Sequence, residues 1–147
     1  MRVALYQPDI PQNTGAILRL AACLGVGVDI IEPCGFVWSD RRLRRAGMDY
    51  LDQALVSRHQ SWNHFHKAAA NRLILLTTRG DAAYTGFQFN QTDTLIVGRE
   101  SAGAPQEVHD AMDATVFIPM QPQTRSLNVA LALAMVLGEA VRQTNGT

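Results

Sequence analysis

Three loops of this chain carry glycine and polar residues of the types that hold a nucleoside. They span residues 76–80, 98–105 and 118–128, and each follows a predicted strand. Glycine lets the backbone approach a ligand closely, and backbone N–H and C=O groups can then hydrogen-bond an adenine or a ribose. One such loop alone is usually only a turn, but three of them in a short chain favour a nucleoside-type ligand.

The spacing of Gly98 and Gly103 is that of the glycines in a phosphate-binding P-loop, yet the rest of that motif is missing. Ala104 and Pro105 stand where a P-loop needs lysine and serine or threonine. A nucleoside triphosphate is therefore not the ligand that the sequence predicts.

Two other cofactor patterns are also incomplete. Gly25 and Gly27 lack a third glycine and precede a predicted strand instead of following one, so the dinucleotide fingerprint fails. His64 and His66 have a metal-like spacing, but no carboxylate or cysteine accompanies them. We predict a surface helix at these histidines and no metal site.

The first predicted helix begins near Asn13 and Thr14, and either residue could serve as its N-cap. Arg19 lies within this helix, and we expect its side chain on the loop side, away from the core. A merely solvated arginine is the alternative. The buried stripe that we predict for the helix consists of Ile17, Leu20, Ala21 and Leu24.

A cluster of four arginines occupies five consecutive positions in a chain whose formal net charge is zero. Asp40 is the one acidic residue beside the cluster, and Leu43 and Ala46 are left to dock on the core. Such a run is often a solvated helix face, but the lack of interleaved acids favours contact with nucleic-acid phosphates. The residues that we predict to bind RNA are Arg41, Arg42, Arg44 and Arg45.

Strand-like and helix-like segments alternate along the whole chain. The predicted strands are 3–6, 28–31, 73–77, 94–97 and 116–118, and the predicted helices are 14–24, 41–45, 64–70, 105–112 and 127–142. This alternation predicts an α/β fold with a mostly parallel sheet and helices on both faces. We find no repeat or linker, so residues 1–147 are predicted to form one domain, with a frayed tail from about Gln143.

The composition is that of a compact protein, with 47% apolar and 18% charged residues. Cys23 and Cys34 cannot make a disulfide framework, and we predict reduced thiols. Neither a signal peptide nor a membrane span is predicted, so we expect a cytoplasmic protein.

The last predicted helix is apolar on nearly all sides, which requires burial within the domain or against a second copy of the chain. Both arrangements are open, and the small size of the domain favours a dimer.

The motifs, taken in chain order, resemble those of the SPOUT class of RNA 2′-O-methyltransferases. The matching segments are residues 13–15 with Arg19, residues 98–105, and residues 118–130 with their Ser-x-Asn sequence. Residues 31–36 and 42–50, which include Gly47, Asp49 and Tyr50, are typical of the short branch that modifies the tRNA wobble position without an added RNA-binding domain. Ala104, Ala130 and Leu131 depart from the pattern of the class.

The resemblance implies a C-terminal trefoil knot that holds S-adenosylmethionine, and no metal. It further implies a homodimer whose sites borrow residues across the interface. The implied product is a 2′-O-methylated wobble cytidine or modified uridine in leucine tRNA. The implied cofactor contacts are Leu76, Thr77, Gly98, Glu100, Gly103, Ile118, Met120, Ser126 and Asn128.

The resemblance also assigns catalytic roles to Arg19, Asn13 and Ser126. A guanidinium stays protonated and is a poor base, so we expect Arg19 to stabilise the ionised hydroxyl electrostatically, with a substrate phosphate as a possible proton acceptor. Two alternatives belong to other classes, a non-catalytic RNA-binding protein and a nucleotide-binding oxidoreductase. A third is 2′-O-methylation of another RNA such as rRNA.

Overall fold

The computed structural model describes residues 1–45 and 55–145 of the 147-residue chain. Ala46, Gly47, Asp49 and Tyr50, which carry part of the resemblance, lie outside the described residues. One seven-stranded sheet has the order β3-β2-β1-β6-β4-β7-β5, and each pair of neighbouring strands is parallel. The predicted α/β fold with a mostly parallel sheet is confirmed. The trefoil knot and the one-domain organisation stay predictions.

The five predicted strands are all present, with ends that differ by at most two residues. They are β1 (Arg2–Tyr6), β2 (Gly27–Ile31), β4 (Leu73–Leu76), β6 (Thr94–Val97) and β7 (Ala114–Phe117). The sequence did not reveal β3 (Val56–His59) and β5 (Ala82–Ala83), which form the two edges of the sheet. An edge strand is covered on fewer sides, so β3 tolerates the polar sequence Val-Ser-Arg-His.

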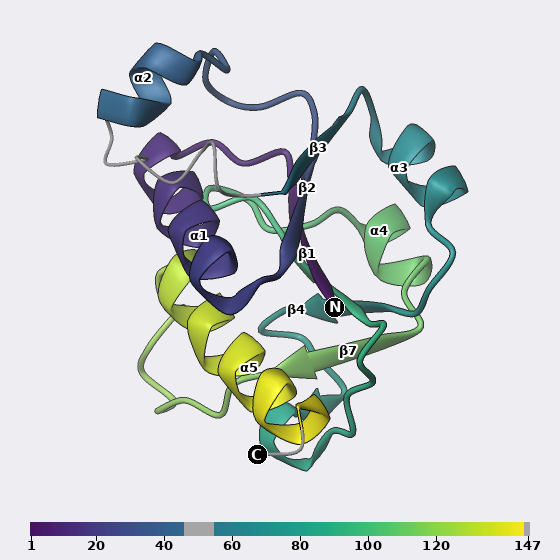
Figure 1. Cartoon of the computed structure of the whole chain (residues 1–147). Helices are drawn as coiled ribbons and strands as arrows, with labels where there is room; N and C mark the ends of the chain where they lie inside the picture. Colours follow the sequence, from purple (N-terminus) through teal and green to yellow (C-terminus); the bar gives the residue numbers. More distant parts are fainter. Residues whose placement is uncertain (46–54, 146–147) are drawn as a thin grey trace.

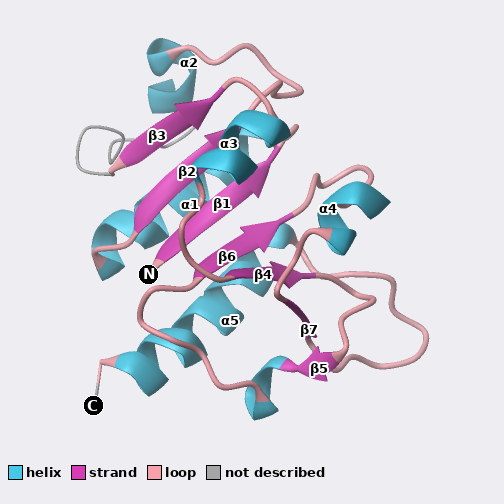
Figure 2. Cartoon of the chain, turned by 90° about the vertical axis from the view of Figure 1, so that its right-hand side faces the viewer, coloured by secondary structure: helices cyan, strands magenta, loops and turns pink. Residues whose placement is uncertain are grey.

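Helices cover both faces of the sheet, as predicted. Figure 2 shows α3 (Trp62–Ala68) and α4 (Gln106–Asp110) in front of the strands, and α1 and α5 behind them. The second layer consists of α1 (Pro11–Leu24), α2 (Asp40–Arg45) and α5 (Val129–Thr144). Each face has its own apolar cluster, with Leu18 and Leu137 central to one and Trp62 and Phe65 to the other. Pro105 is the N-cap of α4 and not its first residue.

Helix α1 begins earlier than the sequence predicted, at Pro11. Its N-cap is Ile10, which makes no capping hydrogen bond with its side chain, so the prediction that Asn13 or Thr14 caps the helix is wrong. A proline at the first position explains the early start, because its fixed φ suits a helix and its missing N–H needs no partner. The buried stripe also differs from the prediction, since Leu18 is fully buried while Leu24 is 41% exposed.

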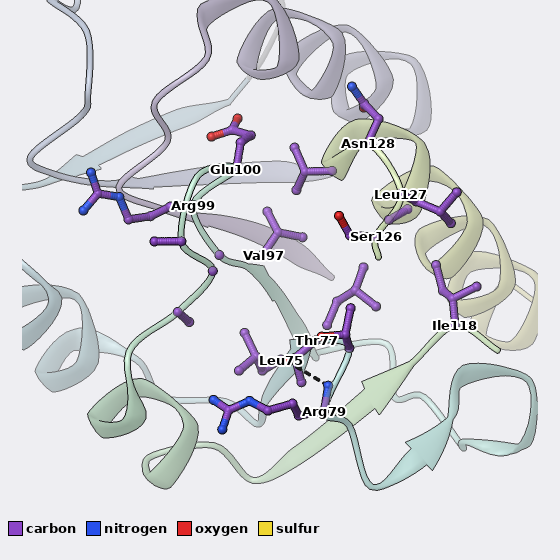
Figure 3. A pocket seen from close by; sticks show the side chains of 18 of the residues that line it. Leu75, Thr77, Arg79, Val97, Arg99, Glu100, Ile118, Ser126, Leu127 and Asn128 are labelled. Carbon is purple, nitrogen blue, oxygen red and sulfur yellow. Dashed lines mark hydrogen bonds between the residues drawn. The ribbon is translucent and has the colours of Figure 1, made fainter. Parts of the chain in front are cut away.

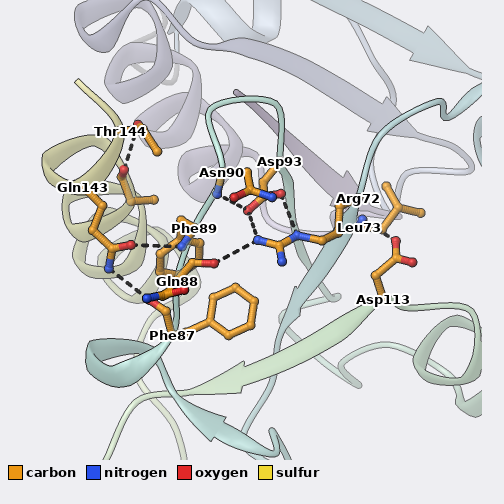
Figure 4. A network of polar contacts seen from close by, with 11 residues as sticks. Arg72, Leu73, Phe87, Gln88, Phe89, Asn90, Asp93, Asp113, Gln143 and Thr144 are labelled. Atoms are coloured by element: carbon orange, nitrogen blue, oxygen red, sulfur yellow. Dashed lines mark hydrogen bonds and ion pairs between the residues drawn. The ribbon is translucent and has the colours of Figure 1, made fainter. Parts of the chain in front are cut away.

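A polar network joins the amino-terminal ends of the central strands to the end of α5 (Figure 4). The buried Asp93 carboxylate accepts two hydrogen bonds from the Arg72 guanidinium, at 2.9 and 2.7 Å, and one from the Asn90 N–H at 2.8 Å. Gln143 Oε1 accepts from the Phe89 N–H at 2.9 Å. The predicted frayed tail is therefore wrong up to Thr144, because this contact fixes the last turn of α5.

His64 and His66 lie exposed on α3, as the sequence predicted. Within residues 1–45 and 55–145, no helix combines the length and the hydropathy that a membrane crossing requires.

We predict that Asp93→Ala lowers the free energy of unfolding by about 3 kcal/mol, because it leaves a guanidinium and an N–H without their acceptor in a buried site. Urea unfolding of the two proteins measures the loss. Glu32→Ala is the matched control, since it removes a carboxylate from the ion pair with Arg58, outside this network. Equally small effects of both substitutions would show that the Asp93 network is dispensable.

Candidate active site

A cavity of about 580 Å³ lies beyond the carboxyl ends of β4, β6 and β7, where ligands bind in parallel sheets (Figure 3). Its walls come from the three loops that the sequence singled out and from the start of α1. All of the predicted cofactor residues line it: Leu76, Thr77, Gly98, Glu100, Gly103, Ile118, Met120, Ser126 and Asn128. Asn13 lines it as well.

The loop after β6 is folded tightly on itself. Arg99 and Gly103 exchange two backbone hydrogen bonds, at 3.2 and 2.8 Å, and Gly103 has a φ of +67° that favours glycine. A Cβ added to Gly98 would lie 2.6 Å from both Ala104 N and Gly103 C. Gly98 is therefore required by the close return of its own loop, which positions the cavity wall.

The same loop is tied to the end of β1 by Asp9 and Glu100. The Asp9 N–H donates to Glu100 Oε2 at 2.9 Å, the Glu100 N–H donates to Asp9 Oδ1 at 3.2 Å, and the Ser101 hydroxyl donates to Asp9 Oδ2. The hydrogen bond from Glu100 lowers the pKa of Asp9, while burial and this carboxylate neighbour raise the pKa of Glu100. The directions of these shifts favour Glu100 over Asp9 as the holder of a proton shared by the pair, and the hydrogen bonds of Glu100 hold the loop against the end of β1.

The start of α5 is fixed by Asn128. Its Oδ1 accepts from the Ala130 and Leu131 N–H groups at 2.9 and 3.2 Å, so Asn128 is the N-cap. Its Nδ2 donates to Asn13 Oδ1 at 2.9 Å and so joins α5 to α1 across the cavity rim. Ser126, which an ordinary cap would have explained, is not the cap and lies exposed in the cavity wall.

A further group of polar residues joins the loop after β4 to α4. Arg79 Nη2 lies 3.0 Å from His109 Nε2, and Arg79 Nη1 donates to Gln106 Oε1 at 3.5 Å. Burial and the Arg79 charge lower the pKa of His109, so its neutral imidazole accepts the hydrogen bond. Neither Arg79 nor His109 was among the predicted site residues, although Arg79 lies in the loop that follows β4, and this position was the available signal.

The cavity residues fit a nucleoside-containing cofactor. Leu75, Leu76, Val97 and Ile118 supply apolar walls for a base, while the tight loops bring backbone polar groups to the rim. Arg99 Nε is buried and has no hydrogen-bond partner within the described residues.

The structure does not bring every predicted site residue into this cavity. Arg19 lies exposed on α1 and is absent from the cavity lining. The four arginines of α2 are exposed on that helix and also lie outside the lining, while Leu43 is fully buried, as expected.

Comparison with known proteins identifies close relatives over the full cavity-forming region. A family model described as the SpoU rRNA Methylase family matches residues 1–138. A tRNA (cytidine(34)-2′-O)-methyltransferase of Beijerinckia indica subsp. indica is 59% identical over 144 residues, covering 96% of this chain and 90% of the relative. The protein of the same description from Escherichia coli is 43% identical, covering 97% and 93%.

Solved structures give a similar result. One, described as giving structural insights into the 2-OH methylation of C/U34 on tRNA, has a TM-score of 0.93 and 39% identity, covering 99% of this chain and 97% of its own. The SpoU methyltransferase AviRb from Streptomyces viridochromogenes, in complex with the cofactor AdoMet, has a TM-score of 0.83 and 30% identity. It covers all of this chain, which spans 61% of that structure.

We predict that Gly98→Ala costs about 1–3 kcal/mol of unfolding free energy, because its Cβ overlaps backbone that cannot move aside. The same substitution at Gly86 is the control, since nothing lies within 4 Å of its added Cβ. That variant should be as stable as the parent or up to about 1 kcal/mol more stable. Thermal unfolding of both variants measures the contrast, and a tolerated Gly98→Ala would contradict the tight-loop account.

We predict that Glu100→Gln preserves the loop, because its amide can donate to Asp9 as the protonated Glu100 carboxyl does. A carboxyl whose pKa is raised by folding contributes stability at low pH and loses it as the pH rises through the folded pKa. The variant lacks this loss, so its stability relative to the parent should rise as the pH increases above about 4, the pKa range of an unfolded glutamate. Urea unfolding across this range tests it, and a difference that does not change with pH would refute it.

Proposed function

The chain belongs to the SpoU rRNA methylase family of methyltransferases, and we propose that it methylates the ribose 2′-OH of the wobble nucleotide, position 34, of a tRNA. The observation that carries the proposal is that all three motif loops line the same cavity. The relatives of this chain are described as acting on nucleotide 34 of tRNA. A cytidine or a modified uridine of leucine tRNA is the proposed substrate, and the cytoplasm is the proposed place of action.

S-adenosylmethionine is the proposed cofactor, and it supplies an electrophilic methyl group on a sulfonium. The chain contributes the site: Leu76 and Ile118 enclose apolar surface, and the loop that begins at Gly98 offers backbone polar groups. The Asn128–Asn13 hydrogen bond keeps the two sides of the rim together, so that Asn13 and Ser126 can orient the ribose. Positioning of this kind supplies much of the rate of a transfer reaction.

We assign to Arg19 the electrostatic stabilisation of the reacting hydroxyl, and we place it in the cavity of a second copy of the chain. Two features support this arrangement: Arg19 is exposed and outside its own cavity, and α5 exposes apolar side chains beside α1. Leu131 is 62% and Met135 43% exposed. Burial of such a face between two copies would complete the site, as the apolar last helix led us to expect.

The RNA surface that we propose consists of α2 and the aromatic loop before it. The α2 arginines are Arg41, Arg42, Arg44 and Arg45, all exposed. Beside them, Phe36 stacks against Trp38, and the Arg58 guanidinium lies 5.1 Å from the centre of the Trp38 ring. Arginines combined with aromatic rings suit the phosphates and bases of a single-stranded loop. Gly35 packs against Asp9, which links this surface to the cavity loop.

The decisive assay is methyl transfer from labelled S-adenosylmethionine to unmodified leucine tRNA, with the product nucleoside mapped. We expect label on the 2′-oxygen of nucleotide 34. Label in rRNA alone would support the rRNA alternative, and RNA binding without cofactor binding would support a non-catalytic protein.

We predict that Arg19→Ala lowers kcat by about a hundredfold or more, because it removes the charge that stabilises the developing oxyanion. Arg19→Lys keeps the charge but loses the fork of donors, so full activity in that variant would show that the charge alone is sufficient.

Mixed dimers test whether Arg19 acts in the second copy. Ser126→Phe blocks the cavity with a ring at an exposed position, so this variant should fold but lose cofactor binding. Equal mixing with Arg19→Ala should restore about a quarter of the parent activity, because half the dimers then contain one intact site. No recovery would mean that Arg19 acts within its own chain.

A further inference from the structure

Arg79 lies at the edge of the cavity and is held by uncharged acceptors. Its side chain extends from the end of β4 toward α4 (Figure 3). There it meets His109 Nε2 at 3.0 Å and Gln106 Oε1 at 3.5 Å. Among the described residues, no carboxylate forms an ion pair with Arg79. The positive charge is therefore oriented but not neutralised.

The arginines that stabilise the fold are paired differently. Each has a carboxylate partner, and none of them lines the cavity: the pairs are Arg2–Asp29, Arg58–Glu32, Arg72–Asp93 and Arg142–Glu139. Arg99 resembles both kinds of arginine. It donates to the uncharged Gln7 Oε1 at 3.4 Å, as Arg79 does to Gln106, and its charge also lowers the pKa of the Asp9 carboxyl. Uncharged partners at Arg79 thus contrast with the four ion pairs elsewhere.

Asp110 of α4 is engaged by Gln106 and not by this cation. Gln106 Nε2 donates to Asp110 Oδ1 at 2.8 Å, while the Oε1 of the same amide accepts from Arg79. Gln106 therefore stands between the carboxylate and the guanidinium. Glu100, the acid in the cavity lining, is engaged with Asp9.

We propose that Arg79 is an anion-binding residue of the cavity and takes an oxyanion of a bound ligand. Two sources have this chemistry: the carboxylate on the amino-acid tail of the methyl donor, and a phosphate of the substrate RNA. The inference rests on the proposed function. It goes further by naming the residue, Arg79, that binds a negatively charged group of the ligand. A guanidinium matches both groups, because its fork of donors can bond two oxygens of one anion.

His109 is a positioning residue for Arg79, since it reaches the ligand only through the guanidinium. Its imidazole fixes one end of the fork and leaves the other N–H groups for the anion. His109→Leu should therefore weaken anion binding in part, whereas His109→Gln, which retains an acceptor, should restore it.

The test compares Arg79→Gln with the parent protein by calorimetry and RNA-binding titration. The probes are S-adenosylhomocysteine, 5′-methylthioadenosine, which lacks the amino-acid tail, and unmodified leucine tRNA at several salt concentrations. Arg142→Gln is the matched control, because it removes the same charge from a pair outside the cavity.

If the carboxylate is the ligand, Arg79→Gln weakens S-adenosylhomocysteine about tenfold and leaves 5′-methylthioadenosine unchanged. If a phosphate is the ligand, tRNA affinity falls and the slope of its salt dependence decreases by about one. Affinities equal to those of Arg142→Gln for all three probes overturn the proposal, and so does an equal loss for both small molecules. A parent protein that binds neither cofactor nor tRNA refutes the proposed function instead.

Discussion

The parallel alignment of the central strands is the constraint on which the cavity depends. Thr94 of β6 is in register with Arg2 of β1 on one side and with Leu73 of β4 on the other. The carboxyl ends of the three strands therefore lie at the same level of the sheet, since Val97 and Leu76 are also in register. Loops from distant parts of the sequence then lie next to one another. The strand register, and not any one motif, brings their functional side chains into one cavity.

Polar contacts between these loops hold them in a fixed arrangement around the cavity. The Asp9–Glu100 and Asn13–Asn128 contacts join residues 91 and 115 positions apart in the chain. Both use side chains that serve two purposes, since Asn128 also caps α5 and Glu100 also lines the cavity. A substitution at either position therefore alters the fold and the site together, which is why stability and binding have to be measured on the same variants.

The sequence predicted the strands and loops well because buried apolar runs and glycine-rich ends leave direct signals. The edge strand β3 left none, since its exposed Ser57 and Arg58 do not follow an apolar pattern. The cap of α1 was mispredicted, because Pro11 lets the helix begin before Asn13 and Thr14, the polar residues that satisfy the capping rule. The Arg79–His109 contact joins residues 30 positions apart, and no local pattern encodes it.

The net charge is zero, but the charged residues fall into two groups: buried ion pairs that stabilise the fold, and exposed arginines. Carboxylates such as Asp29 and Asp93 are buried against arginines that stabilise strand ends, so these acids do not oppose a bound anion. The arginines of α2 and Arg79 lie instead at exposed positions of the loops and helices that follow strands. Electrostatic attraction falls within about 10 Å at moderate salt, so local placement decides what the protein binds and total charge does not. A neutral chain can in this way present a local cationic surface.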